Sequence, residues 1–285
     1  MSLKHLLLAA AYQPLKIGNS LLRQVGVPRC GRLRVLLYHD IAPLDEAHFA
    51  SQLSWLSRSW RFITPTDFTA MISGELPVLE DCLLLTFDDG FASNRRMAET
   101  VLNSMGIKAL FFIISEFAEL SELSDWRSFV NQNIYPGMQL DSVPAHWQNM
   151  RWNDLRYLIE TGHSIGAHTS THARLSKLDH TELAAEIILS ADALEENLGC
   201  KIEHFAYTFG DLSSFSSAAL ALARSRFKFI YTGLRGLNGI GVAPWAIRRD
   251  SLNAGDSFSL VGALLEGGAD RFYAKNLATY ESWGG

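Results

Sequence analysis

The stretch Cys82-Leu83-Leu84-Leu85-Thr86-Phe87-Asp88-Asp89-Gly90 decides how this chain folds. It is a short, nearly uninterrupted apolar run followed by two carboxylates and a glycine. An apolar run of this length beside a turn signal predicts a parallel strand that is buried on both faces. Because Gly90 allows a tight turn, Asp88 and Asp89 are predicted to lie at the carboxyl end of this strand.

Comparable apolar runs recur on both sides of this stretch and alternate with segments of helical periodicity. The alternation predicts parallel strands joined by helices, which is the α/β class. With about seven such units and no linker between them, we expect one barrel-like domain whose functional residues lie where strands meet the following loops. The other predicted strands are residues 33–38, 109–114, 164–167, 204–207, 229–232 and 245–248, and the clearest predicted helices are residues 91–105, 154–161 and 181–198.

Two segments stand outside this alternation. Residues 1–32 are predicted to be an N-terminal helical extension, and residues 33–285 the main barrel domain. Residues 115–150 lack a steady period, and an irregular segment of that length in a compact domain is usually functional. We therefore predict an insertion near the mouth of a site, with Trp126, Phe129 and Trp147 as candidate ligand contacts.

The N-terminal extension has a basic start followed by a short apolar run, residues 6–11. This run barely reaches the length of a signal peptide, and Tyr12-Gln13-Pro14 follows it where small residues would be needed for cleavage. We expect instead an amphipathic helix that continues to about Leu22. Peripheral membrane contact through residues 6–8 is left open.

Composition and charge argue against several classes of protein. Hydrophobic residues make up 48% and charged residues 19% of the 285 residues, which is typical of a globular chain. The net charge is -5 and the basic residues form no run, so no nucleic-acid partner is predicted. The three cysteines, Cys30, Cys82 and Cys200, form no CxxC pair, which suits buried thiols in a reducing compartment. Because the N-terminus carries no convincing signal peptide, we expect a cytoplasmic protein that could work at the inner face of the membrane.

A second candidate element follows the predicted strand 164–167. His168 and His172 are four residues apart, and within one helical turn such side chains share a face and can bind one ion. Two histidines and one carboxylate leave coordination positions for water and substrate, as a catalytic zinc requires. The structural alternatives are two surface histidines and, for Asp88-Asp89, an exposed turn with a capping aspartate. Because both pairs follow strands, we favour a shared metal site.

At this point two motifs carry a resemblance to a known family. Thr86-Phe87-Asp88-Asp89-Gly90 and His168-Thr169-Ser170-Thr171-His172, in this order, resemble the TFDDG and H-[ST]-x-x-H motifs of polysaccharide deacetylases. These enzymes form the NodB-homology group, carbohydrate esterase family 4. Similar stretches extend the resemblance over roughly residues 33–250, and they are Tyr38-His39, residues 152–162 and Phe205-Ala206-Tyr207-Thr208-Phe209-Gly210.

The resemblance implies a distorted (β/α)7-type barrel, a divalent metal ion that is usually zinc, and hydrolysis of N-acetyl groups on sugars. By their positions in the motifs, Asp89, His168 and His172 would hold the metal, and Asp88 would be the general base. The chemistry agrees, because a metal lowers the pKa of its water toward about 7 and an unligated carboxylate can take the proton. Backbone N–H groups near Phe209 would help to stabilise the oxyanion.

Two departures from the family's pattern affect the predicted site. Ala206 and Thr208 stand where the family commonly has arginine and proline. A basic residue from a late strand is therefore predicted to orient the base; we prefer Arg249, the alternative being a solvated strand end. No histidine follows His204, so the family's late histidine, which protonates the departing amine, is missing. His39 is the predicted substitute, as general acid or as a support for the site.

The other candidate side chains have two interpretations each. Trp152 and Tyr207 could stack on a sugar ring, as could the three aromatic residues of the insertion, although aromatic residues at such places pack into cores as readily. His163 and His204 are expected to be ordinary residues at the ends of strands or helices. These side chains are therefore candidates that only the fold can place.

The combined prediction is a metal-dependent hydrolase that removes an N-acyl group, in the first place N-acetyl, from an amino sugar. The sugar would belong to a polysaccharide, a glycolipid or a glycan precursor, and a cytoplasmic location favours the precursor. Two alternatives stay open. One is a glycan-binding barrel that has lost catalysis, as the altered third motif suggests, and the other is an esterase acting on O-acetylated sugars.

Overall fold

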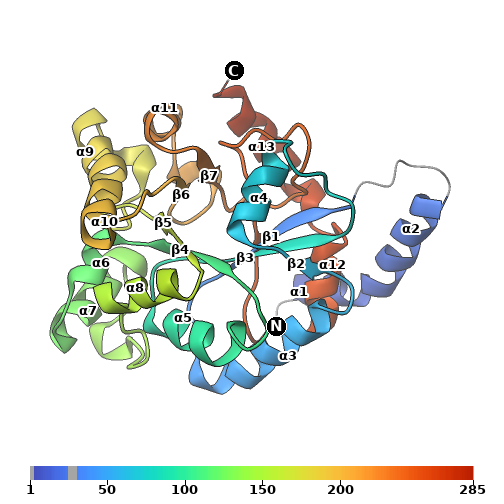
Figure 1. Cartoon of the computed structure of the whole chain (residues 1–285), viewed down its shortest axis with the longest axis horizontal. Coiled ribbons are helices and arrows are strands. Elements are labelled where there is room, and N and C mark those ends of the chain that lie inside the picture. The colour runs from blue at the N-terminus through green and yellow to red at the C-terminus, as the bar shows by residue number, and fades with distance from the viewer. Residues whose placement is uncertain (1–2, 25–30, 285) are drawn as a thin grey trace.

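The computed structural model describes residues 3–24 and 31–284. Its centre is a single sheet of parallel strands that curls into a half-barrel, with helices packed around it (Figure 1). The strands are β1 (Leu33–Tyr38), β2 (Arg61–Phe62), β3 (Cys82–Phe87), β4 (Ala109–Ile113), β5 (Ser164–Ala167), β6 (His204–Ala206), β7 (Phe229–Tyr231) and β8 (Asp250–Ser251). Their order along the sheet is β7-β6-β5-β4-β3-β1-β8, and β2 pairs with β3 off this path. The α/β class and the barrel-like sheet are therefore confirmed.

Helices follow most of the strands, as the alternating pattern predicts. They are α1 (Leu3–Ala10), α2 (Tyr12–Gln24), α3 (Glu46–Leu56), α4 (Pro65–Ile72), α5 (Ala92–Met97), α6 (Ser115–Glu119), α7 (Leu123–Phe129), α8 (Trp152–Glu160), α9 (His180–Ala184), α10 (Ser190–Leu198), α11 (Ser217–Arg226), α12 (Phe258–Leu265) and α13 (Asp270–Ser282). The predicted helices 91–105 and 181–198 are confirmed, but each contains a π-helical turn, Ala98–Leu102 in the first and Ala185–Leu189 in the second.

Strand β3 lies inside the sheet, between β4 and β1. All six residues of β3 and all six of β1 are buried, and the two strands pair in register from Leu33 opposite Cys82 to Tyr38 opposite Phe87. Side chains on one face of the sheet, such as Leu84, form a cluster with α4, while those on the other face pack against the outer helices. Because the strands pair in parallel, their carboxyl ends lie side by side.

The predicted strand at residues 245–248 is wrong. Ile247 forms only an isolated parallel bridge with Tyr231, and the strand that completes the sheet is β8, two residues further on. The backbone of Arg248 is satisfied by a side chain instead of a neighbouring strand. Its N–H donates to Asn238 Oδ1 at 2.9 Å, and its carbonyl accepts from Asn238 Nδ2 at 2.9 Å.

Strand β8 is short, and a buried group of charges fixes it to β1. Arg34 on β1 is 1% exposed and pairs with Asp250 at 3.0 Å and with Asp270 of α13 at 2.6 Å. Arg235 reaches the same Asp250 carboxylate at 3.2 Å. Because breaking such a buried pair leaves an uncompensated charge, this group sets where β8 lies.

The predicted insertion, residues 115–150, folds into short helices around a small apolar core that also includes Phe91 and Ile114. It contains α6, α7, a π-helical turn at Val130–Ile134 and a short 3-10 helix at Leu140–Ser142. Trp126 and Phe129 are only 3% and 9% exposed inside this core. The expectation that these two rings stack on a ligand is therefore wrong, because they hold the insertion together.

Residues 3–24 of the N-terminal extension are helical as predicted, with two helices separated at Ala11. Both pack against the region of α12. Leu15 lies beside Gly268, and Asn19 Nδ2 donates to the backbone carbonyl of Glu266 at 3.0 Å. In the part of the chain that the structure describes, no helix combines the length and apolar character needed to cross a bilayer. The domain boundary at residue 32 stays a prediction.

His163 and His204 lie at the amino ends of β5 and β6, away from the carboxyl ends where the site is predicted. His163 Nδ1 accepts the backbone N–H of Ala109 at 3.0 Å, and burial, with Lys108, lowers its pKa to about 4. Burial likewise lowers the pKa of His204 to about 4. Both are neutral, structural histidines, as expected. Cys82 is buried, Cys200 is half-buried and both are free thiols, while Cys30 lies outside the described residues.

Candidate active site and metal centre

Asp88 and Asp89 follow β3 directly, as predicted, and both are buried, with 2% and 1% exposure. The chain turns sharply here. Asp89 has a φ of 72° and Gly90 a φ of 91°, a left-handed conformation that aspartate tolerates better than most residues and glycine adopts freely. The Asp88 N–H donates to the Tyr38 carbonyl at 2.9 Å. The alternative of an exposed capping turn is therefore excluded.

His168 follows β5 and lies opposite this turn. Its backbone N–H donates to the carbonyl of Ile113 at 2.9 Å, and its Nδ1 lies 2.8 Å from the carbonyl of Ala206. Since a carbonyl can only accept, Nδ1 carries the hydrogen and Nε2 presents its free electron pair. This is the tautomer that a metal ligand needs.

His172 reaches the same place, but not through a helical turn as predicted. The segment after β5 is a loop, in which Thr169 and His172 have left-handed φ angles of 65° and 66°. Glu186 holds this loop, accepting the backbone N–H groups of Ser170 and Thr171 at 3.1 and 2.9 Å. The predicted convergence of the two imidazoles is correct, and the predicted helical geometry is wrong because the loop is bonded to a distant helix.

The imidazole of His172 is oriented like that of His168. Its Nδ1 lies 3.0 Å from the carbonyl of Asn133 in the insertion, so its Nε2 is also free to bind a cation. Nothing in the sequence pointed to Asn133, because the contact is made by a backbone carbonyl that any residue could supply. The insertion thus completes the site.

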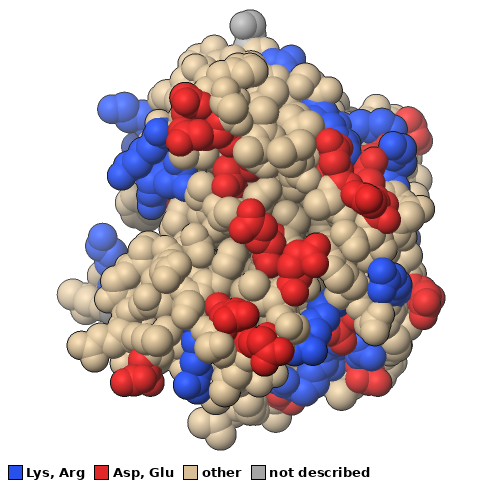
Figure 2. Space-filling model, turned by 90° about the vertical axis from the view of Figure 1, so that its left-hand side faces the viewer, with Lys and Arg blue, Asp and Glu red and all other residues tan. Residues whose placement is uncertain are grey.

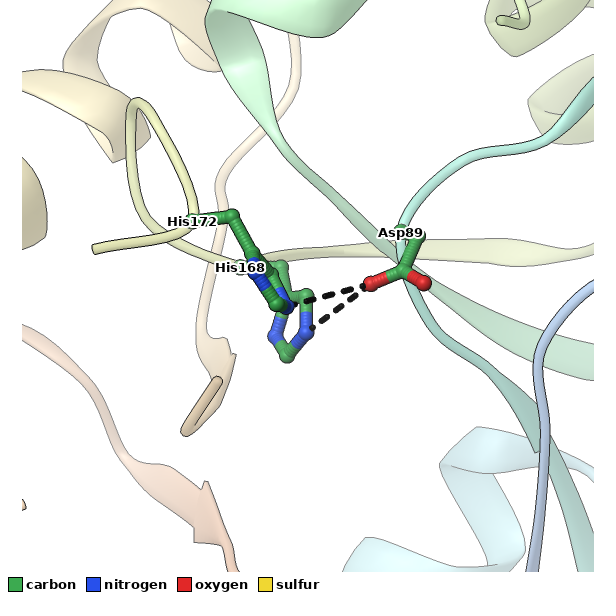
Figure 3. A group of neighbouring side chains, drawn as sticks. All are labelled: Asp89, His168 and His172. Carbon is green, nitrogen blue, oxygen red and sulfur yellow. Dashed lines mark ion pairs between the residues drawn. The ribbon is translucent and has the colours of Figure 1, made fainter. Parts of the chain in front are cut away.

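Asp89 and the two histidines form one buried group (Figure 3). Asp89 Oδ1 lies 3.5 Å from His168 Nε2 and 3.4 Å from His172 Nε2. Their three ligand atoms lie within 4.8 Å of one another, and Asp89 Oδ1 has no hydrogen-bond partner among the described residues. A buried carboxylate oxygen facing two imidazole electron pairs fits a divalent cation, which would compensate all three.

The electrostatics of the group point the same way. Burial disfavours the charged form of Asp89, but His168, His172 and His39 outweigh it and hold the pKa of Asp89 well below its usual range. Burial opposes protonation of His168, yet Asp88 and Asp89 raise its pKa. The two carboxylates therefore create a buried site that attracts positive charge.

Asp88 does not belong to the three-residue group but lies beside it, with Oδ2 3.8 Å from His168 Nε2. Arg249 holds this carboxylate with two hydrogen bonds, of 2.6 Å to Oδ1 and 2.8 Å to Oδ2. The guanidinium is fully buried, its Nε donates to the Thr232 carbonyl at 2.9 Å, and it lies over the ring of Phe112. Arg249 is therefore no solvated strand end, and it fixes the orientation of Asp88.

His39 follows β1 and is half-buried. Tyr38, the residue before it, pairs with Phe87, the residue before Asp88, so His39 lies at the same edge of the sheet as the metal group. The carbonyl of His39 accepts the side-chain amide of Asn94 at 2.8 Å, which fixes the backbone at this position. Its role as general acid stays a prediction.

The third motif brings Phe209 to the site. Phe209 has a φ of 61° and is 37% exposed, and its ring lies 4.5 Å from that of His172. Thr208, which replaces the family's proline, donates from Oγ1 to the carbonyl of Ala173 at 2.7 Å. This bond ties the third motif to the histidine loop. The use of backbone N–H groups near Phe209 for the oxyanion stays a prediction.

The two remaining aromatic candidates differ from the prediction. Tyr207 is 1% exposed and its ring stacks on Phe215 at 4.2 Å, so it is a core residue, and its assignment to sugar stacking is wrong. Trp152 is half-buried at the start of α8, where Nε1 donates to Glu119 at 3.1 Å. Since its described contacts are with Glu119 and the core, a sugar contact of Trp152 stays a prediction.

The surface in Figure 2 carries acidic and basic side chains interspersed among uncharged residues, without a broad basic area on this face. Together with the net charge of -5, this distribution gives no indication of a nucleic-acid partner.

Comparison with known proteins agrees with the motifs. The Bacillus subtilis (strain 168) protein YxkH, whose name places it among polysaccharide deacetylases, is 22% identical over 241 residues, covering 82% of this chain and 76% of that protein. The structure of IcaB from Ammonifex degensii matches with a TM-score of 0.65 at 24% identity, covering 84% of this chain and 98% of the other. The Streptococcus pyogenes deacetylase PplD in complex with acetate gives a TM-score of 0.64 at 19% identity, covering 81% and 97%.

These structural matches show that the fold is shared. The sequence model of the polysaccharide deacetylase family matches residues 76–226, a range that includes Asp88, Asp89, His168 and His172. Because this range is more than half of the sequence, the chain belongs to the polysaccharide deacetylase family of hydrolases.

Proposed function

We propose that this protein is a metal-dependent deacetylase that hydrolyses the N-acetyl group of an amino sugar in a polysaccharide, a glycolipid or a glycan precursor. One observation carries the proposal. Asp88 is buried beside the group formed by Asp89, His168 and His172 but is oriented by Arg249 instead of joining that group. A carboxylate kept apart from the metal ligands is what a general base requires.

Asp89, His168 and His172 would hold the divalent cation, which we propose to be zinc because nitrogen ligands with one carboxylate suit it. When bound, such a cation polarises the amide carbonyl and makes water more acidic. Asp88 takes the proton as the oxygen of water bonds to the amide carbon. Arg249 keeps the Asp88 carboxylate aimed during this step. The carbon–nitrogen bond then breaks, and His39 supplies a proton to the departing amine.

The two alternative functions, a glycan-binding barrel and an esterase, require different roles of Asp88, Arg249 and His39. A barrel that only binds glycans needs neither a free base nor an arginine fixed on it, so the buried pair of Asp88 and Arg249 favours catalysis. An esterase differs in its leaving atom, which is an alkoxide oxygen and not an amine. An amine leaves only with an added proton. Amide hydrolysis should therefore depend on His39 as proton donor more strongly than ester hydrolysis does.

The test of the proposed function is acetate release. The purified protein is analysed for bound metal and then assayed on N-acetylated free sugars, nucleotide sugars, lipid-linked sugars and polymers. We expect acetate from at least one of these classes, loss of release after chelation and recovery with zinc. Unchanged release after complete metal removal would contradict metal dependence, and glycan binding without release from any class would favour the binding barrel.

Substitution of His39 by alanine should lower the rate of amide hydrolysis about 10²-fold or more, since the amine then departs without its proton donor. Hydrolysis of an aryl acetate, whose leaving group needs no added proton, should change little. Both rates are measured at equal metal content, and His39→Gln serves as a control that keeps a polar side chain of similar size. An amide rate close to wild type in both variants would remove His39 from the mechanism.

We further propose that α1 attaches the protein to an anionic lipid surface. Leu3, Leu6 and Leu7 of α1 are 72%, 51% and 65% exposed, which is unfavourable unless another surface covers them. The sequences of α1 and α2 contain the basic residues Lys4, Lys16 and Arg23 and no acidic residue. A short helix with exposed leucines and only basic charge suits the interface of an anionic bilayer.

This attachment is tested by sedimentation with phosphatidylglycerol-containing vesicles. The triple variant Leu3→Ser, Leu6→Ser and Leu7→Ser should bind at least about tenfold more weakly, because each leucine loses its apolar burial in the lipid. Leu44→Ser is the control, since Leu44 is 96% exposed elsewhere on the surface. Vesicle binding that is absent in the wild type, or equal in both variants, would rule out the attachment.

A further inference from the structure

The insertion is joined to the catalytic turn over several consecutive residues. The backbone N–H of Ala92 donates to the carbonyl of Gln148 at 2.7 Å, and that of Met150 donates to the carbonyl of Gly90 at 2.7 Å. Phe91 and Asn149 form an antiparallel bridge between these bonds. The end of the insertion is therefore paired with the residues that directly follow Asp89.

Trp147, the residue before this paired segment, is fixed in position by Asp40. Its Nε1 donates to Asp40 Oδ2 at 3.0 Å, and Asp40 directly follows His39. The same carboxylate accepts the Ser93 hydroxyl at 2.7 Å and lies 3.1 Å from His146 Nε2. Asp40 thus anchors the insertion to the end of β1, on the side of the site where the proposed proton donor lies.

Tyr135 completes this arrangement. Its ring stacks on Trp147, with centroids 4.6 Å apart and an interplanar angle of 25°, and Phe91 packs against Trp147 at 5.8 Å. Tyr135 is nevertheless 37% exposed. Two residues before Tyr135, the carbonyl of Asn133 lies 3.0 Å from His172 Nδ1, so this part of the insertion lies next to the metal group.

The exposure of Tyr135 distinguishes it from the other aromatic residues of the insertion. Trp126 and Phe129 are buried in the small core, where they stabilise the insertion itself. Tyr135 rests on a positioned tryptophan and keeps part of its surface open beside the catalytic group. An aromatic ring of this kind suits the apolar face of a pyranose, because it offers a rigid flat surface with a polar hydroxyl at its edge.

We propose that Tyr135, stacked on Trp147 and anchored through Asp40, is the sugar-binding platform that selects a pyranose substrate for this site. The inference rests on the proposed function and deepens it, since it assigns substrate selection to the insertion. The ring of Tyr135 contacts the sugar that carries the acyl group or the sugar next to it. Trp147 and Asp40 act as positioning residues, because they contact Tyr135 and its support instead of the reacting atoms.

The test compares two substrates that differ in whether they contain a sugar. Tyr135→Ala should raise the KM for an N-acetylated oligosaccharide about tenfold, which corresponds to the loss of one aromatic stacking contact. Its kcat/KM for 4-nitrophenyl acetate, which has no sugar ring, should stay within about twofold of wild type. Tyr135→Phe keeps the flat ring and should behave like the wild type toward both substrates.

Tyr273→Ala is the matched control, because Tyr273 is a half-buried tyrosine on α13 and should leave both substrates unaffected. An unchanged KM for the oligosaccharide in Tyr135→Ala would overturn the proposal. A parallel loss for 4-nitrophenyl acetate would overturn it as well, since the ring would then act only by shaping the catalytic group.

A second measurement keeps this proposal separate from the proposed function. Calorimetric titration of the zinc-loaded protein with the deacetylated form of this oligosaccharide, which cannot be hydrolysed further, gives a Kd whether or not acetate is released from the substrate. About tenfold weaker binding by Tyr135→Ala than by wild type supports the platform even if no deacetylation is found. Equal Kd values for the two proteins would overturn it even in an active enzyme.

Discussion

Substitution of Asp88 by asparagine is expected to lower kcat for acetate release by about 10²- to 10⁴-fold, the range that loss of a general base produces. The amide has the size of the carboxylate and keeps one acceptor oxygen for Arg249, but it cannot take a proton from water. Asp88 lies outside the group of Asp89, His168 and His172, so bound metal should stay at the wild-type level. Both quantities are measured on the same preparation.

The control for Asp88→Asn must account for the broken ion pair, because removing one partner of a buried pair costs about 3–5 kcal/mol of stability. Asp250→Asn provides it. Asp250 is fully buried and pairs with Arg34 and Arg235, but it belongs to the group that fixes β8. Both variants should lose stability in a thermal unfolding experiment, and only Asp88→Asn should lose most of its turnover. Similar turnover in the two would contradict the role of Asp88 as base.

Substitution of His168 by alanine is expected to abolish metal binding under conditions where the wild type is saturated. Loss of a residue that only orients a ligand typically weakens metal affinity 10- to 100-fold, so loss of the ligand itself should exceed about 100-fold. Zinc at about 1,000 times its Kd should stabilise the wild-type fold by about 4 kcal/mol. The variant should show no such gain, because it retains only Asp89 and His172.

The measurement is the thermal midpoint with and without zinc, together with metal content after dialysis. His163→Asn is the matched control, since His163 is a buried histidine at the other end of β5. The asparagine side chain of this variant can still accept the backbone N–H of Ala109. A zinc-induced shift that persists in His168→Ala, or one that disappears in His163→Asn, would show that the cation binds elsewhere.

The fold could be predicted from the sequence where apolar runs are long. The strands β1, β3 and β4 were predicted nearly to the residue, because a strand covered on both faces needs consecutive apolar side chains. Strands β2 and β8 have two residues each, too few to give a pattern. The segment 245–248 was mistaken for a strand because its composition is apolar, whereas only Ile247 bridges to β7 and the side chain of Asn238 satisfies the backbone of Arg248.

The site shows the same division. The motifs predicted that the aspartates and the histidines lie close together. The contact of Arg249 with Asp88 was predicted because Ala206 stands where the family commonly has arginine. The burial of Tyr207 could have been predicted from the alternation of side chains along a strand. Tyr207 lies on the same face of the sheet as Phe205, and Ala206 lies on the opposite face. The contacts of Asn133 and Glu186 could not be predicted, since they depend on how the insertion and a loop fold in three dimensions.

Because the reactive groups lie at the carboxyl ends of the strands, a label can be attached at the amino ends without touching them. Lys201 stands there, next to the start of β6, with a side chain 83% exposed. A dye or a solid support coupled to this amine would lie on the far side of the sheet from Asp88 and Tyr135. Protein immobilised in this way would keep the carboxyl ends of its strands facing the solution.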